Sequence, residues 1–124
     1  MKDIAIFGAG GFGKEIACLL DRINKENPTW NFIGFFDDNT ELKDKMISHY
    51  GKCFGGINEL NSYDKDICLA IAVGNPNTVK NIVEKINNTH ISFPNIIHPT
   101  TKCADDKTLF IGKGNIIQGD CFFS

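Results

Sequence analysis

Residues 4–17 read IAIFGAGGFGKEIA, and this stretch decides the fold. A short apolar run, of the length of a buried strand, leads into a glycine cluster, after which apolar residues recur at helical spacing. Gly8, Gly10 and Gly13 stand between the two elements at G-x-G-x-x-G spacing. The sequence therefore predicts a strand, a tight turn and a helix.

The glycine spacing also indicates what the turn can bind. The first glycine permits the turn, the second lets the backbone approach a phosphate, and the third lets helix and strand pack closely. Free N–H groups and the positive end of the helix dipole favour an anion at this point. We predict that Gly8, Gly10 and Gly13 bind a nucleotide diphosphate, the alternative being a glycine-rich turn that only packs.

A second phosphate-binding pattern overlaps the first. The segment from Gly8 to Lys14 also satisfies G-x-x-x-x-G-K, but Glu15 follows where a Ser or Thr hydroxyl would hold magnesium. A carboxylate cannot replace that hydroxyl, and it adds negative charge near the phosphates. We therefore exclude an NTPase of this kind.

Length and composition limit the class of protein. A chain of 124 residues with 42% hydrophobic and 23% charged residues can bury one ordinary core. The formal net charge is -2 and the lysines are scattered, which argues against a nucleic-acid partner. No apolar run approaches the roughly 20 residues of a membrane span, and the chain enters a strand directly instead of a signal sequence. We therefore expect a cytoplasmic protein without a membrane partner.

The cysteines predict neither a disulfide framework nor a metal site. They are odd in number, widely spaced, without a C-x-x-C pair and without a nearby set of histidine ligands. We expect reduced and mostly buried thiols at Cys18, Cys53, Cys68, Cys103 and Cys121.

An acidic pair follows the next predicted strand, which spans Trp30 to Phe36. In a strand-helix-strand unit the carboxyl end of this strand lies beside the glycine turn. Asp37 or Asp38 is therefore predicted to accept hydrogen bonds from a ribose or a base, at close to the roughly 20-residue separation expected for such an acid. The alternative is a turn-forming acidic pair at a strand end.

The middle of the chain predicts one more strand-helix-strand unit. We expect a surface loop over residues 40–52, a brief helix around 57–63, a buried strand at 66–73, a helix at 77–87 and an extended segment at 91–93. Gly74 and Asn75 follow the buried strand, so they emerge at the same edge of the sheet as the glycine turn. Their backbone is a further candidate for ligand binding.

The character of the sequence changes after Pro94. Helical spacing disappears, and Ile111 and Ile117 are separated by one hexapeptide period. Short strands and turns at this period are typical of a parallel β-helix, although two hexads also fit chance or an ordinary hairpin.

In this order, the segments resemble the PglD/NeuD-like sugar O- and N-acyltransferases, bacterial enzymes that acetylate nucleotide sugars or sialic acid. The resemblance covers nearly the whole chain and rests on GAGGFGKE at 8–15, FDDN at 36–39, AVGNP at 72–76, IHPT at 97–100 and IGKG at 111–114. It implies an α/β fold in two parts. Residues 1–94 would form a small Rossmann-like parallel sheet with flanking helices, and residues 95–124 the first coil of a left-handed β-helix.

The resemblance also implies a substrate site and partners. Gly10 to Gly13, which include Gly11 and Phe12, would approach the diphosphate of a nucleotide sugar, most simply a UDP-sugar. Asp37 and Asp38 would face the uridine or ribose, with Gly74 and Asn75 bordering the same pocket. The full-length family member would be a homotrimer that holds acetyl-CoA in clefts between β-helix subunits, so we expect no acetyl-CoA on this chain.

The family mechanism uses a β-helix histidine as general base, which takes a proton from the sugar amine or hydroxyl as it attacks the thioester. The sequence ends at Ser124, before the coils where that histidine belongs, and His98 in the IHPT segment is predicted to be structural. We therefore assign no catalytic residue. The expected chain is a truncated member that binds the sugar nucleotide and is inactive alone.

A rival interpretation is a stand-alone regulatory module that senses NAD(H) or a CoA-type nucleotide through the same turn. The glycine spacing and Asp37 do not separate the two, because ribose and pyrophosphate recognition look alike from sequence. The hexads favour the acetyltransferase, since a nicotinamide sensor has no use for them. A third interpretation is a domain that binds nothing and only assists assembly.

Overall fold

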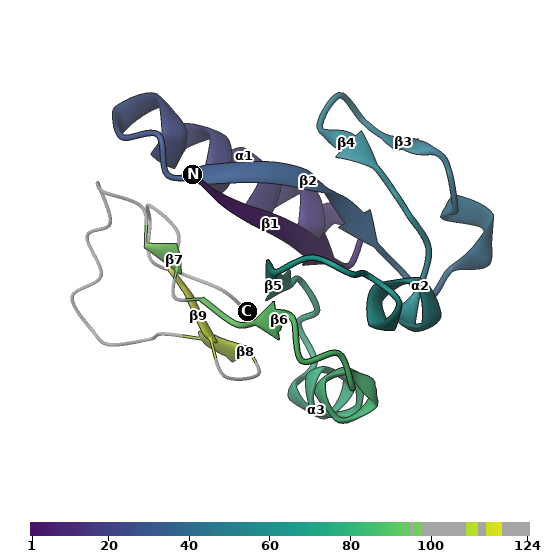
Figure 1. Cartoon of the computed structure of the whole chain (residues 1–124). Helices are drawn as coiled ribbons and strands as arrows, with labels where there is room; N and C mark the ends of the chain where they lie inside the picture. The colour runs from purple at the N-terminus through teal and green to yellow at the C-terminus, as the bar shows by residue number, and fades with distance from the viewer. Residues whose placement is uncertain (95, 98–108, 112–113, 118–124) are drawn as a thin grey trace.

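A parallel sheet forms the centre of the molecule. The computed structural model describes residues 1–94, 96–97, 109–111 and 114–117 (Figure 1). Four strands pair in parallel in the order β2-β1-β5-β6. Their bounds are β1 Lys2–Phe7, β2 Trp30–Phe36, β5 Ile67–Ile71 and β6 Ile91–Ser92. The strands predicted from the sequence are confirmed.

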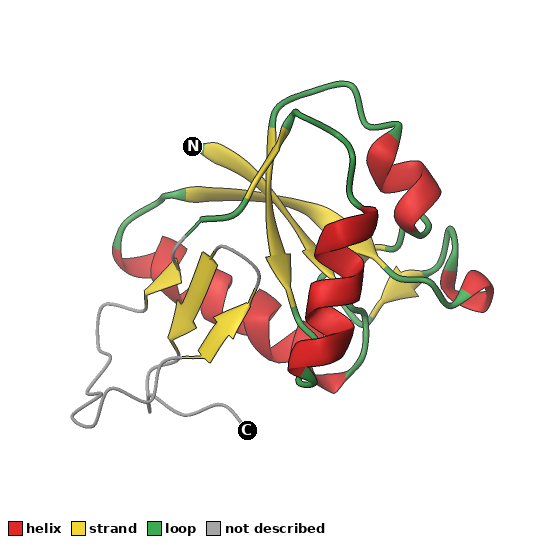
Figure 2. Cartoon of the chain, turned by 90° about the horizontal axis from the view of Figure 1, so that it is seen from below, coloured by secondary structure: helices red, strands yellow, loops and turns green. Residues whose placement is uncertain are grey.

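Helices cover both faces of this sheet. Helix α1, Gly11–Glu26, leads from β1 to β2, and α3, Pro76–Lys85, leads from β5 to β6. Because right-handed crossovers are the rule and these two run toward opposite edges of the sheet, the helices lie on opposite faces. Figure 1 shows α1 behind β1 and β2, with α3 below β5 and β6, and Figure 2 views the same layers from below.

The core explains this two-sided cover. Four consecutive residues of β1 are buried, Ile4, Ala5, Ile6 and Phe7, which requires apolar neighbours on both faces of the strand. Helix α1 packs its apolar stripe of Ile16, Leu19, Leu20 and Ile23 against the sheet, and α3 contributes Val79 and Ile82. The predicted class, a small Rossmann-like parallel sheet with flanking helices, is confirmed.

The predicted loop over residues 40–52 is wrong. This stretch contains the short helix η1, Thr40–Leu42, and an antiparallel hairpin of β3, Met46–Ile47, with β4, Gly51–Lys52. Strands of two residues are too short to show an alternating pattern. The residues with left-handed backbone in this stretch are Asp44 and Ser48, with φ of 66° and 54°. Because neither is a glycine, the sequence did not indicate a turn at these positions.

Helix α2, Ile57–Asn61, confirms the predicted brief helix. Asparagine side chains tie it to the end of α3. The Asn61 Nδ2 donates to the Lys85 carbonyl at 3.0 Å, and Asn88 Nδ2 donates to the carbonyls of Leu60 and Tyr63 at 3.0 and 2.7 Å. The end of α2 is thereby held beside the end of α3.

The β-helix expected over residues 95–124 falls largely outside the described residues. Within them, β7, Ile96–Ile97, pairs in parallel with β9, Gly114–Ile117, and β8, Leu109–Ile111, pairs antiparallel with β9. The β-helix and the division at residue 94 therefore stay predictions. His98, Cys103 and Cys121 also lie outside the described residues.

The three described cysteines are free thiols. Cys53 is buried, whereas Cys18 and Cys68 are only partly buried. In the described part of the chain, no group of three or more His, Cys, Asp or Glu side chains is placed to hold a metal ion. Of the helices described there, none has the length and apolar character needed to cross a membrane.

Candidate functional site

The glycine turn is fastened to the end of β2. The Gly8 N–H donates to the Phe36 carbonyl at 2.7 Å, and the Ala9 N–H donates to Asp37 Oδ2 at 2.8 Å. The other carboxylate oxygen of Asp37 accepts from the Asn39 N–H at 2.9 Å. The structure therefore brings Asp37 to the turn, as the strand-helix-strand geometry predicts.

The end of β5 lies against the same turn. The Ala72 N–H donates to the Phe7 carbonyl at 2.8 Å, and Gly74 and Asn75 follow on the surface. The strand order reverses between β1 and β5, because one connection leads to β2 and the other to β6. In open α/β sheets, ligands bind outside the carboxyl ends of the strands at such a switch point.

Two of the four glycines in the turn are required by packing. Gly8 has a φ of 113°, and a Cβ on it would lie 2.7 Å from the Ala72 carbonyl oxygen. A Cβ on Gly13 would overlap the Gly8 carbonyl oxygen. The predicted reasons for the first and third glycines, a tight turn and close packing of helix on strand, are therefore seen in the structure.

Packing within the protein does not require a glycine at the other two positions, Gly10 and Gly11. Apart from the adjacent residues and the backbone of α1 itself, no described atom lies within 4 Å of a Cβ built on Gly10 or Gly11. Neither residue has a left-handed φ, and Gly10 has φ -85° in extended backbone. Open space therefore lies over the backbone where α1 begins, and packing among the described residues leaves room for larger side chains there.

The start of α1 also lacks a side-chain cap. Gly10 is its N-cap residue and provides no hydrogen-bonding side chain, and the first turn contains no acidic residue. The half-buried Phe12 stands within this turn. Because the first N–H groups of a helix have no partner within the helix, this end is suited to an anion.

Helix α3 begins at the same edge but is capped. The Asn75 Oδ1 accepts from the N–H groups of Asn77 and Thr78 at 2.9 and 3.4 Å. The side-chain oxygen of Asn75 is thus used within the chain, although the residue stands where the sequence places it. Gly74 is exposed beside it.

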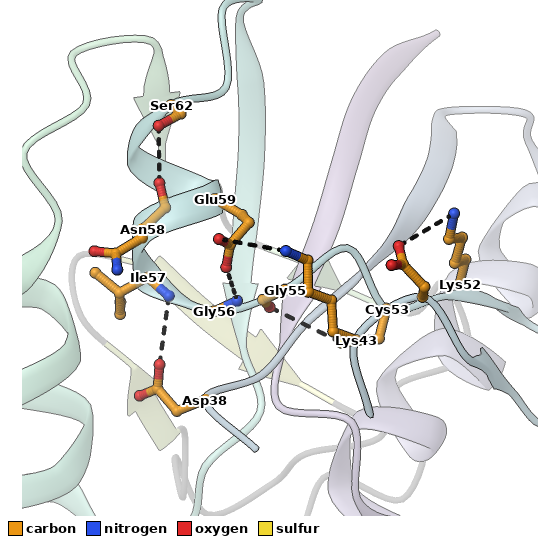
Figure 3. Close-up of polar contacts among 11 residues, drawn as sticks. Asp38, Lys43, Lys52, Cys53, Gly55, Gly56, Ile57, Asn58, Glu59 and Ser62 are labelled. Atoms are coloured by element: carbon orange, nitrogen blue, oxygen red, sulfur yellow. Dashed lines mark hydrogen bonds and ion pairs between the residues drawn. The ribbon is translucent and has the colours of Figure 1, made fainter. Parts of the chain in front are cut away.

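A cavity of about 450 Å³ lies between the end of β2 and the start of α2. Asp37 and Asp38 line it, together with residues that sequence reasoning missed, among them Lys43, Gly56, Asn58 and Glu59 (Figure 3). These residues come from the segment after the acidic pair, and their approach to Asp38 is set by tertiary packing. The signal available in the sequence was the Gly55-Gly56 pair directly before a helix.

Side chains occupy the start of α2 in this cavity. The Gly56 N–H donates to Glu59 Oε1 at 2.7 Å, and this hydrogen bond is the main reason that the pKa of Glu59 is lowered. Lys43 Nζ lies 3.9 Å from the other Glu59 oxygen. The Ile57 N–H donates to Asp38 Oδ1 at 3.3 Å. The N–H groups of Gly56 and Ile57 at the start of α2 are thus bound by carboxylates, whereas the first turn of α1 contains no acidic residue.

One described histidine, His90, is hydrogen-bonded to a carboxylate at the opposite edge of the sheet. His90 Nδ1 lies 2.8 Å from Asp66 Oδ1, and these residues directly precede β6 and β5. The strand order therefore places the pair at the amino ends of the strands, away from the glycine turn. This pair is not a general base for a ligand held at the turn.

A parallel α/β sheet with a G-x-G-x-x-G turn at its switch point defines a Rossmann-like domain. Residues 3–86 match the family model described as the PglD N-terminal domain, and the chain belongs to this family. Over 118 residues, 95% of its length, the chain is 31% identical to a UDP-N-acetylbacillosamine N-acetyltransferase of Bacillus subtilis (strain 168).

The predicted membership of the PglD/NeuD-like sugar acetyltransferase family is therefore confirmed. The matched region covers 52% of the Bacillus protein. The chain thus corresponds to about half of that relative.

Proposed function

We propose that the glycine turn and the uncapped start of α1 bind the diphosphate of a nucleotide sugar, with a UDP-sugar as the expected ligand. The chain would then supply the substrate-binding part of an enzyme that acetylates an amino sugar. The observation that carries this proposal is the open backbone at Gly10 and Gly11, where the fold itself needs no glycine. A phosphate does need one, because a Cβ would keep it from the helix N–H groups.

The similar Bacillus protein, whose name specifies a UDP-sugar substrate, favours this ligand over a nicotinamide cofactor. Nucleotide sugars and NAD both carry a pyrophosphate and a ribose, so the turn alone fits either. The ligand is therefore proposed from the family and the turn together.

Acetyl-CoA would be the co-substrate of the whole enzyme, as in other sugar acetyltransferases, and would supply the acetyl group. The described residues would bind and orient the nucleotide sugar. Abstraction of the acceptor proton would depend on the β-helix histidine of the family mechanism, a role that no residue of this chain is assigned. Trimer formation would depend on the same β-helix.

Titration calorimetry with UDP-N-acetylglucosamine, NAD and acetyl-CoA tests the proposal. We expect saturable binding of the UDP-sugar to one site per chain and no saturation by acetyl-CoA. Tight binding of NAD without binding of the UDP-sugar would contradict the proposal and favour a nicotinamide-sensing module.

Gly10→Ala sharpens the same experiment. The methyl group meets open space in the protein but stands where the phosphate would approach, so we expect about tenfold weaker binding of the UDP-sugar. Because alanine is a poorer N-cap residue than glycine, we also expect a loss of stability of less than about 1 kcal/mol. Glu26→Ala is the control, because Glu26 is exposed at the far end of the 16-residue α1, about 24 Å away. Equal affinities of the two variants would argue against phosphate binding at the turn.

A further inference from the structure

Asp37 has both carboxylate oxygens occupied by the chain itself. Its Oδ2 accepts from the Ala9 N–H at 2.8 Å and its Oδ1 from the Asn39 N–H at 2.9 Å. Its own N–H donates to the Gly55 carbonyl at 2.7 Å. One half-buried residue therefore holds together the glycine turn, the end of β2 and the segment that leads into α2.

Asp38 differs from its neighbour in exposure and in partners. It is exposed, and its Oδ1 accepts one long hydrogen bond, 3.3 Å, from the Ile57 N–H. Among the residues that the structure describes, its Oδ2 has no hydrogen-bond partner. Figure 3 shows the Asp38 carboxylate directed at the start of α2, where it lines the cavity.

The cavity has a size suited to part of a nucleotide. Its volume of about 450 Å³ lies within the range of about 300–1,000 Å³ that small-molecule sites occupy. Asp37 lines the cavity and also accepts a hydrogen bond from the glycine turn, so this one residue adjoins both. A diphosphate at the start of α1 would therefore place its nucleoside toward this cavity.

We propose that the two adjacent aspartates divide the work of nucleotide binding. Asp37 is a positioning residue that fixes the glycine turn for the diphosphate without touching the ribose. Asp38 is the residue that accepts a hydrogen bond from a ribose hydroxyl, through Oδ2. A carboxylate is an acceptor only, so it suits the hydroxyl donors of a ribose. This division rests on the proposed function.

A double-mutant cycle between side chain and ligand tests the division. The affinities of UDP, 2′-deoxy-UDP and 3′-deoxy-UDP are measured for the wild-type chain, Asp38→Ala and Asp37→Ala, well below the unfolding temperatures. We expect loss of one of the two hydroxyls to weaken binding about tenfold in the wild type and less than about twofold in Asp38→Ala. In Asp37→Ala, loss of the same hydroxyl should still weaken binding about tenfold. All three ligands should bind at least about tenfold more weakly to this variant than to the wild-type chain.

Asn24→Ala is the matched control for Asp37→Ala. The Asn24 Oδ1 also accepts from two backbone N–H groups, those of Thr29 and Trp30, both at 2.9 Å, near the other end of α1. Both variants lose two hydrogen bonds from backbone N–H groups, and Asn24→Ala also loses the one that its Nδ2 donates to the Trp30 carbonyl at 2.8 Å. We expect each variant to lower Tm by at least roughly 5 °C. A purely structural role for Asp37 would lower Tm and leave the affinity of the folded chain unchanged, as in Asn24→Ala.

The outcomes separate this inference from the proposed function. Coupling of the hydroxyl to Asp37 instead of Asp38, or an unchanged UDP affinity in Asp37→Ala, overturns the division while nucleotide binding stands. Failure of the wild-type chain to bind UDP at all overturns both.

Discussion

Helices α1 and α3 start in the same structural setting but differ in their N-caps. Each follows a central parallel strand, β1 or β5, at the carboxyl edge of the sheet. The N–H groups at the start of α3 are bound by Asn75, whereas the N-cap residue of α1 is Gly10, which has no side chain to offer. The difference teaches that one helix end is completed by the chain itself and the other is suited to completion by a ligand.

The largest expected effect concerns how closely α1 approaches its strand. In Gly13→Ala the new Cβ overlaps the Gly8 carbonyl oxygen, so helix and turn must separate. We expect the free energy of unfolding to fall by about 3 kcal/mol, measured by urea denaturation. Gly11→Ala is the control within the same turn, because its Cβ meets open space, and it should unfold like the wild type. Equal stability of the two variants would refute the close packing.

The next prediction concerns a substitution that gives α1 a side-chain N-cap. Gly10 has the extended backbone of an N-cap residue, so the carboxylate of Gly10→Asp can accept from the helix N–H groups. We expect a few tenths of a kcal/mol of added stability and at least about 100-fold weaker UDP-sugar binding, because the carboxylate takes the N–H groups and repels the phosphates. Calorimetry and thermal unfolding measure the two quantities. Unchanged affinity would mean that the diphosphate lies elsewhere.

The reverse change removes the cap of α3. Asn75→Ala leaves the N–H groups of Asn77 and Thr78 without their side-chain acceptor and should cost about 1 kcal/mol of stability. The affinity for the UDP-sugar should stay within about twofold, because the amide oxygen serves the helix. Asn75→Asp keeps the cap and should restore the stability. A loss of binding much larger than the loss of stability would show that the Asn75 side chain contacts the ligand.

The sequence could predict the sheet and the glycine turn because their signals are local. A buried apolar run and a glycine spacing each act over a few residues, so β1, α1 and the position of Asp37 follow directly. The hairpin of β3 and β4 and the cavity wall at Asn58 could not be predicted in this way. The strands of the hairpin are too short to show an alternating pattern, and the cavity wall depends on packing between segments that are distant in the chain. Likewise, only the hydrogen bonds in the structure distinguish Asp37 from Asp38.

The smallest effect is a pH dependence at the capped start of α2. The hydrogen bond from the Gly56 N–H outweighs the opposing effect of desolvation and, with a smaller contribution from Lys43, lowers the pKa of Glu59 below its ordinary value of 4.5. A carboxyl whose pKa is lower in the folded chain stabilises it above the unfolded pKa, and this contribution is lost as the pH falls through the folded value. The Tm difference between wild type and Glu59→Gln should therefore be largest above about pH 5 and shrink below about pH 4. A difference that does not vary with pH would contradict this role.

The most direct test of the central claim is the response of backbone amides to the ligand. In ¹H–¹⁵N spectra recorded during a titration with UDP-N-acetylglucosamine, the amides of residues 10–13 should shift strongly and saturate. The amides of Asn77 and Thr78, which Asn75 already binds, should stay in place. Saturable shifts at the start of α3 with none at the start of α1 would contradict the account.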